Sequence, residues 1–107
     1  MTTEIKGTHG YTPDEDILKD IDKKMHRLEH VKDCIADLHI TLDRDKHGEF
    51  SAEANIHFRW GNMGHIKTAD HNLHKAVDQL FAKITAKSTK EKDKVQNHEG
   101  TLKRYEE

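Results

Sequence analysis

The sequence has one cysteine and one proline, and aromatic residues make up only 6% of its 107 positions. The single cysteine, Cys34, excludes an intramolecular disulfide and a zinc site built on several cysteines. No apolar run approaches the roughly 18 residues of a membrane span, and the first residues lack the apolar region of a secretion signal. We therefore expect a cytoplasmic protein that is neither inserted in a membrane nor stabilised by disulfides.

Recognisable catalytic motifs are also missing from the sequence. It contains no glycine-rich phosphate loop, no paired carboxylates in a recognisable frame and no nucleophile triad. Cys34 follows an expected helix and has no local arrangement of histidine and acid beside it, so we interpret it as a structural thiol. We expect a protein that is not an enzyme and that binds no cofactor and no small-molecule substrate.

Histidine, by contrast, is abundant, with ten residues in the chain. His26 and His30 are four residues apart on one expected helix, and His71 and His74 are three residues apart on another. Either pair has the spacing to chelate a metal ion, but nothing supplies a clear third ligand, and such spacings arise readily when histidine is this frequent. We therefore expect no functional metal site.

Charge is distributed unevenly along the chain. The 18 basic and 20 acidic residues give a formal net charge of −2 with neutral histidines. Residues 75–104 carry eight basic and four acidic groups, a net charge of +4, whereas residues 1–74 carry a net charge of −4. The last two glutamates of the chain account for the remaining −2. Because free histidine titrates at about pH 6.5, we expect a net charge near zero at pH 7 and a net positive charge at pH 6.

Apolar periodicity predicts the first two elements. Residues 2–8 are expected to form an edge strand. Thr12, Pro13 and Glu15 are typical of a helix start, with Thr12 as the N-cap, and this helix is expected to end near His30. Its apolar residues recur at helical spacing: Ile17, Ile21, Met25 and Leu28.

The apolar period then changes to two, which indicates strands with one buried face. Residues 37–43 and 50–59 alternate in this way around a turn at residues 45–48, so they are expected to form a hairpin. A second turn leads to a short fourth strand in which Ile66 and Thr68 face inward.

The last predicted element is a long helix with Asp70 as its N-cap. Its apolar residues again follow helical spacing: Leu73, Val77, Leu80, Phe81 and Ile84. The apolar stripe fails at Ser88, so the helix is expected to project past its core and to end at Gly100. We predict one domain over residues 1–97 and a flexible tail over residues 98–107.

The predicted order is β-α-β-β-β-α, with strands two to four as an antiparallel meander. Both amphipathic helices must cover the single apolar face of the sheet. The fold class is therefore an α+β sandwich of two layers, with a four-stranded sheet and two helices on one face.

A stripe of lysines follows one side of the last helix, with residues four, three and four apart: Lys83, Lys87, Lys90 and Lys94. The stripe flanks the apolar face, so it can border a groove. Lysines late in a helix also complement its negative end, which is one interpretation. The other is a series of phosphate contacts to nucleic acid, with Lys24 and Arg27 of the first helix as a second wall. Asp20 shares that wall and weakens it.

Two further features favour contact with a polyanion. His39 and His57 occupy outward strand positions and are expected on the surface. Trp60, with Phe58 and Met63 near a turn, has the composition of a stacking platform for a base, although a tryptophan at a strand end also serves as a lid on a core.

Short fragments between Ile5 and Lys94 form an ordered set. They are Ile5-x-Gly7-x-His9, Thr12-Pro13, Lys24 with Arg27-Leu28-Glu29, His39-Ile40-Thr41-Leu42, Ala52-Glu53-Ala54-x-Ile56-His57, the run from Asn72 to Asp78, and Lys83 with Lys90-x-Lys92-x-Lys94. Together they resemble the ribosome hibernation promoting factors, a family also called ribosome-associated inhibitors, ribosomal subunit interface proteins or sigma-54 modulation proteins.

The resemblance implies a β-α-β-β-β-α fold similar to a double-stranded RNA-binding domain. It also implies binding to the 30S subunit, free or in the 70S ribosome, in the channel for messenger and transfer RNA, with translation silenced under stress or in stationary phase. The implied contacts to 16S ribosomal RNA are Lys24, Arg27, Lys83, Lys87, Lys90, Lys92 and Lys94. A short form without the long C-terminal domain of some members, monomeric off the ribosome, is expected.

His74 stands where the family has tyrosine, and we expect it, with His39 and His57, to be an auxiliary RNA contact. Two alternatives stay open. One is a general module for structured RNA without preference for the ribosome. The other is a regulatory module that contacts proteins through its acidic first helix.

Overall fold

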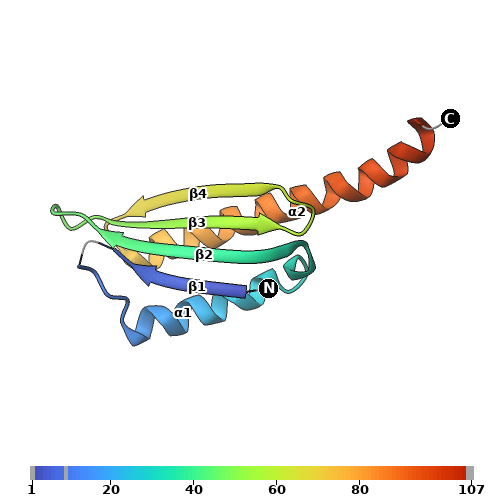
Figure 1. Ribbon diagram of the computed structural model, residues 1–107. Coiled ribbons are helices and arrows are strands. Elements are labelled where there is room, and N and C mark those ends of the chain that lie inside the picture. Colours follow the sequence, from blue (N-terminus) through green and yellow to red (C-terminus); the bar gives the residue numbers. More distant parts are fainter. Residues whose placement is uncertain (1, 9, 106–107) are drawn as a thin grey trace.

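The computed structural model describes the backbone of residues 2–8 and 10–105 and the side chains of these ranges as far as residue 93. Within these ranges one sheet has the strand order β1-β2-β3-β4. Figure 1 shows its strands: Thr2–Gly7 (β1), Ile35–Arg44 (β2), Phe50–Phe58 (β3) and Met63–Asp70 (β4). β1 runs parallel to β2, and the other neighbouring strands are antiparallel. The predicted edge strand and meander are therefore confirmed.

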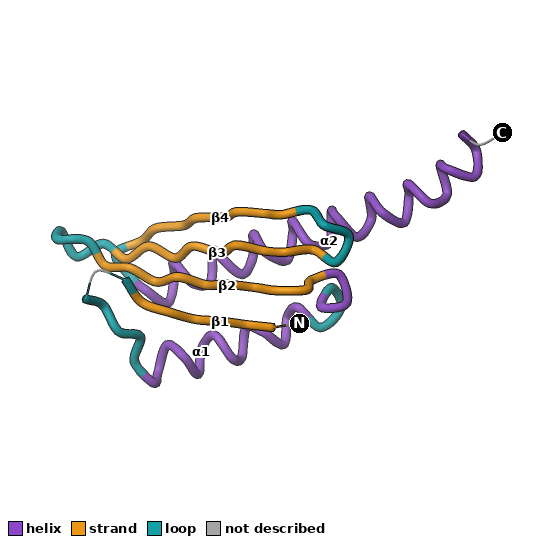
Figure 2. Tube along the Cα trace, in the orientation of Figure 1, coloured by secondary structure: helices purple, strands orange, loops and turns teal. Residues whose placement is uncertain are grey.

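Two α-helices lie on the same side of this sheet (Figures 1 and 2): Glu15–Met25 (α1) and Leu73–Tyr105 (α2). Short 3₁₀ turns at His26–Leu28 and Lys32–Cys34 lead from α1 into β2. The helices cover one face and leave the other to solvent. This arrangement is the predicted α+β sandwich of two layers.

The core lies between the sheet and the two helices. Alternate residues of β2 and β3 point toward the helices and are buried, which is the pattern expected of strands with one covered face. They pack against the helical stripe, and the largest fully buried side chains include Ile17, Ile21, Leu38, Ile40, Leu42, Ile56, Leu80, Phe81 and Ile84. Cys34 is buried in the same cluster, as expected of a structural thiol.

The N-cap residues of both α-helices differ from the prediction. Asp14, and not Thr12, caps α1, because its Oδ1 accepts a hydrogen bond from a backbone N–H of the first turn at 2.9 Å. Asn72, and not Asp70, has this position in α2, where its Oδ1 accepts from Lys75 N–H at 3.2 Å. In each case two good capping residues stand two positions apart, and their side chains alone do not decide between them.

The second helix extends well beyond the sheet, as Figure 1 shows. Its 33 residues correspond to about 50 Å at the usual rise per residue. Ser88 is still buried, and the helix continues through Gly100 to Tyr105, so the predicted end at Gly100 is wrong. The flexibility of residues 98–107 stays a prediction. In the part of the chain that the structure describes, no helix is both long and apolar enough to cross a membrane.

Candidate nucleic-acid interface

A groove of about 520 Å³ runs between α2 and the edge strand β4, and we call it the lysine groove. The helix contributes Lys83, Lys87 and Lys90, and the strand contributes His65 and Lys67. The helix lysines follow one another by three or four residues, so they lie about 4.5 to 6 Å apart along the helix axis. The structure therefore brings three of the predicted cations to one groove and adds a fourth lysine from the sheet.

Lys87 lies closely against β4 because Gly64 has no side chain. A Cβ atom on Gly64 would lie 2.5 Å from Lys87 Cε and 3.1 Å from Lys87 Cδ. Lys87 is consequently half-buried, whereas Lys83 and Lys90 are exposed. The aliphatic stem of Lys87 is held against the strand, and the residue still lines the groove.

The strand wall of the groove is the part that sequence reasoning missed. The alternation that points Ile66 and Thr68 inward points His65 and Lys67 away from the core, so the signal for their exposure is present; because β4 is an edge strand, both residues line the groove at the border of the sheet. The side chain of His65 contacts Glu53 of β3, with 2.5 Å between His65 Nε2 and Glu53 Oε2. What the alternation does not provide is the position of α2 beside this particular edge of the sheet.

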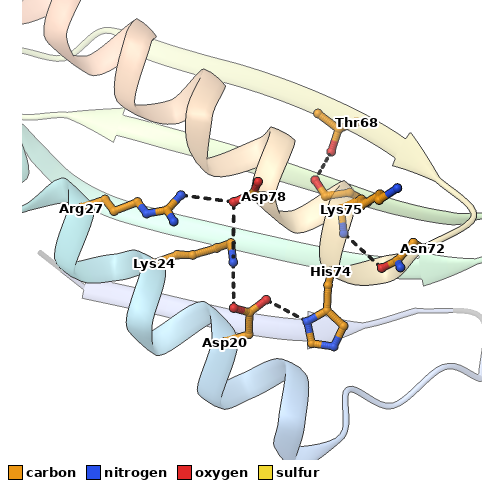
Figure 3. A network of polar contacts seen from close by, with 9 residues as sticks. Asp20, Lys24, Arg27, Thr68, Asn72, His74, Lys75 and Asp78 are labelled. Carbon is orange, nitrogen blue, oxygen red and sulfur yellow. Dashed lines mark hydrogen bonds and ion pairs between the residues drawn. The ribbon is translucent and has the colours of Figure 1, made fainter.

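A second group of charged side chains joins α1 and the 3₁₀ turn that follows it to α2, and Figure 3 shows it from close by. Lys24 Nζ lies 2.7 Å from Asp20 Oδ1 and 3.7 Å from Asp78 Oδ1. The same Asp78 oxygen lies 3.1 Å from Arg27 Nη1, and His74 Nδ1 lies 2.9 Å from Asp20 Oδ2. We call this group the interhelix network, and its two cations balance its two carboxylates when His74 is neutral.

Burial gives this network a structural role. Lys24 is only 8% exposed, which is rare for a lysine unless it is paired. Burial raises the pKa of Asp20, but hydrogen bonds from Lys24 and His74 outweigh this effect, so the pKa is lowered overall. Lys24 and Arg27 are already paired with carboxylates, so they offer a phosphate less net charge than the groove lysines do. Their contact with RNA stays a prediction.

The last two predicted cations lie near the end of the described side chains. Lys92 is turned away from the groove, since its Nζ donates to the backbone oxygen of His30 at 2.9 Å. This contact ties α2 to the connection between α1 and β2. The side chain of Lys94 lies outside the described residues.

The outer face of the sheet carries the predicted surface histidines. His57 is exposed, and His39 Nδ1 lies 3.8 Å from Glu4 Oε2. This face is opposite the helices and separate from the interhelix network that holds His74. Among the described residues, no group of three or more histidine, cysteine or acidic side chains is arranged to hold a metal ion.

Sequence comparison identifies relatives of this chain. Residues 3–96 match the family described as Sigma 54 modulation protein / S30EA ribosomal protein. A ribosome hibernation promoting factor from Klebsiella oxytoca is 32% identical over 75 residues, which are 70% of this chain and 77% of that protein.

Solved structures share the fold. A ribosomal subunit interface protein from Coxiella burnetii has a TM-score of 0.77 at 24% identity, over 87% of this chain and 99% of the other. The N-terminal domain of Protein Y from Thermus thermophilus has a TM-score of 0.71 at 18% identity, over 84% of this chain and 98% of the other. The two-layer sandwich is thus the fold of these two proteins as well.

Proposed function

Because the chain belongs to the sigma 54 modulation protein / S30EA ribosomal protein family, we propose that it binds the small ribosomal subunit and inhibits translation under stress or in stationary phase. It does so by occupying the channel that messenger and transfer RNA otherwise use. Its partners are the 30S subunit, free or within the 70S ribosome, and 16S ribosomal RNA. The observation that carries this proposal is the lysine groove.

The groove has the chemistry that a phosphate backbone requires. Each lysine ammonium is a compact point charge that pairs with a phosphate without reading the base. Four lysines line the groove, and its entire lining contains no acidic residue. Each phosphate that they neutralise releases counterions, so the logarithm of the binding constant falls by about 0.7 to 0.9 per contact for each tenfold rise in salt. Four contacts give a slope of about −2.8 to −3.6.

Inhibition by occupancy of the channel requires only that the protein binds there and fills space. The Cα trace extends over 58 × 23 × 19 Å, so the bound protein is an elongated body. No reaction step is required, because a bound protein excludes messenger and transfer RNA by its volume. The sheet and core supply the rigid body, and the groove supplies the attachment.

The other proposed contacts are secondary to the groove. Lys24, Arg27, Lys92 and Lys94 complete the rRNA contacts, with His39, His57 and His74 as auxiliary ones. The paired state of Lys24 and Arg27 supports this order, because their carboxylate partners already offset their charge.

The test replaces Lys83, Lys87 and Lys90 together with glutamate and measures co-sedimentation with 30S subunits and 70S ribosomes. Losing three phosphate contacts lowers the affinity at 0.1 M salt by at least about 100-fold. A matched control carries the same change of charge at Lys6, Lys23 and Lys46, which are exposed and lie outside the groove. We expect the control to bind as the unchanged protein does, apart from a small long-range effect.

Binding of the groove variant at unchanged affinity would contradict the proposal. The alternatives have their own signatures in the same assay. A general RNA-binding module co-sediments equally with 50S subunits and with any structured RNA. A protein-binding module loses nothing in either lysine variant and instead depends on the acidic residues of α1.

A further inference from the structure

Trp60, the only tryptophan in the chain, lies in the turn between β3 and β4 and is 37% exposed. Its ring stacks on Phe58, with 5.7 Å between the ring centroids and 8° between the ring planes. Phe58 is buried at the end of β3, so it supports one side of the indole from the core. The residue keeps 37% of its surface exposed, so part of the indole is open to a ligand.

Backbone hydrogen bonds hold this turn in place. Phe58 N–H donates to Asn62 O at 2.9 Å, and Gly61 N–H donates to Phe58 O at 3.0 Å. Arg59 N–H donates to Cys34 O at 2.9 Å, which ties the turn to the segment before β2. Gly61 has a φ of 95°, which glycine adopts without strain. A ring presented on such a closed turn loses little freedom when a ligand stacks on it.

The same turn borders the lysine groove. Asn62 Nδ2 donates to Glu91 Oε2 at 3.4 Å, which brings the turn against α2 one helical turn beyond Lys87. Phe58 and Lys87 both lie close to Gly64 of β4. A Cβ atom placed on Gly64 would lie 3.5 Å from Phe58 Cε2 and 2.5 Å from Lys87 Cε. The supporting ring under Trp60 is therefore adjacent to a groove lysine.

We propose that Trp60 is a stacking platform for one unpaired base of an RNA strand whose phosphates lie in the lysine groove. This inference rests on the proposed function, and it adds a contact that phosphate binding alone does not require. Stacking on an aromatic side chain accepts every base, because every base has a π-face. Adjacent lysines favour a nucleic acid over an apolar peptide as the occupant. Met63, which is 64% exposed, extends the apolar surface beside the turn.

A lid on the core is the competing role for the same residue. A ring that only covers Phe58 changes the free energy of unfolding when it is removed and leaves RNA affinity alone. A stacking platform changes the affinity for a strand that carries bases and leaves the affinity for a bare backbone alone. The two roles are therefore separable by the choice of ligand.

The first experiment uses the intrinsic fluorescence of the unchanged protein, in which Trp60 is the sole indole. It is titrated with a ten-nucleotide oligouridylate and with an abasic ribose-phosphate backbone of the same length. We expect the oligouridylate to quench the emission and to bind about tenfold more tightly than the abasic backbone. Equal affinity and equal quenching by the two ligands would overturn the proposal, and no variant is needed for this outcome.

The second experiment compares Trp60→Ala with Trp60→Phe. The alanine variant should bind the oligouridylate about tenfold more weakly than the unchanged protein and bind the abasic backbone equally well. The phenylalanine variant, which keeps a ring over Phe58, should recover most of the loss. Urea unfolding of each variant sets the concentration of folded protein, so a stability change is not mistaken for lost stacking.

The 30S subunit separates failure of this inference from failure of the proposed function. If Trp60→Ala binds 30S normally while the variant with glutamate at Lys83, Lys87 and Lys90 does not, stacking is refuted and the function stands. A fluorescence change on 30S that isolated 16S RNA does not reproduce places a ribosomal protein against Trp60 and also overturns the inference.

Discussion

Replacing Gly64 with alanine tests whether the position of Lys87 in the groove matters for binding. The new Cβ would lie 2.5 Å from Lys87 Cε and 3.1 Å from Lys87 Cδ. Both carbons belong to the outer half of a flexible side chain, so the lysine moves and the strand does not. The stem of Lys87 must then leave its place against β4, and its ammonium leaves the row formed with Lys83 and Lys90.

The expected effect is large on binding and small on stability. Less packing of the lysine stem lowers the free energy of unfolding, but alanine in place of glycine restores about 0.4 to 1 kcal/mol through the unfolded state. The net change is therefore within about 1 kcal/mol. Loss of one phosphate contact weakens binding about fivefold to eightfold at 0.1 M salt and reduces the salt slope by about 0.7 to 0.9.

The assay is 30S binding at several salt concentrations, combined with urea unfolding. Gly7→Ala is the matched control, since its Cβ would overlap the backbone oxygen of Tyr11, which cannot move aside as a lysine stem can. That control should lower the free energy of unfolding by more than about 2 kcal/mol and leave the affinity of the folded fraction unchanged. The reasoning is refuted if Gly64→Ala binds with unchanged affinity and unchanged salt slope.

Two further predictions concern protonation. The fold lowers the pKa of Asp20 below its ordinary value of 3.8, so its contribution to stability is complete above that value and is lost as the pH falls through the folded-state pKa. Asp20→Asn should therefore lower the free energy of unfolding by about 1 to 3 kcal/mol at pH 7, with the difference shrinking toward pH 3 in urea titrations. Because free histidine gains positive charge between pH 7.5 and pH 6, 30S binding should be tighter at pH 6 than at pH 7.5. Equal affinities at the two pH values would leave the histidines without a role in binding.

The fold is largely predictable from this sequence because periodicity dominates it. Alternation in β2 and β3 and helical spacing in α1 and α2 specify one apolar face each, and a single sheet covered by two helices is the arrangement that buries all of them. The errors concern element ends. A helix can pass Gly100 because one glycine in a helix interior costs only about 1 kcal/mol relative to alanine.

The candidate site is predictable only where one element carries it. Lys83, Lys87 and Lys90 share a helix, so their spacing alone places them together. The roles of Lys67 and Gly64 depend on which strand lies beside α2, and that is decided by the packing of the whole sheet. The same limit applies to the interhelix network, where the pairing of Lys24 with Asp20 follows from helical spacing and its approach to Asp78 does not.

Competition on the 30S subunit tests the central claim, occupancy of the decoding channel, most directly. Labelled messenger RNA and initiator transfer RNA are bound to 30S subunits, and the protein is added over a range of concentrations. The account predicts displacement of both ligands, with half-displacement near the affinity of the protein for 30S and no displacement by the variant with glutamate at Lys83, Lys87 and Lys90. Stable complexes that hold messenger RNA, transfer RNA and the protein together would contradict it.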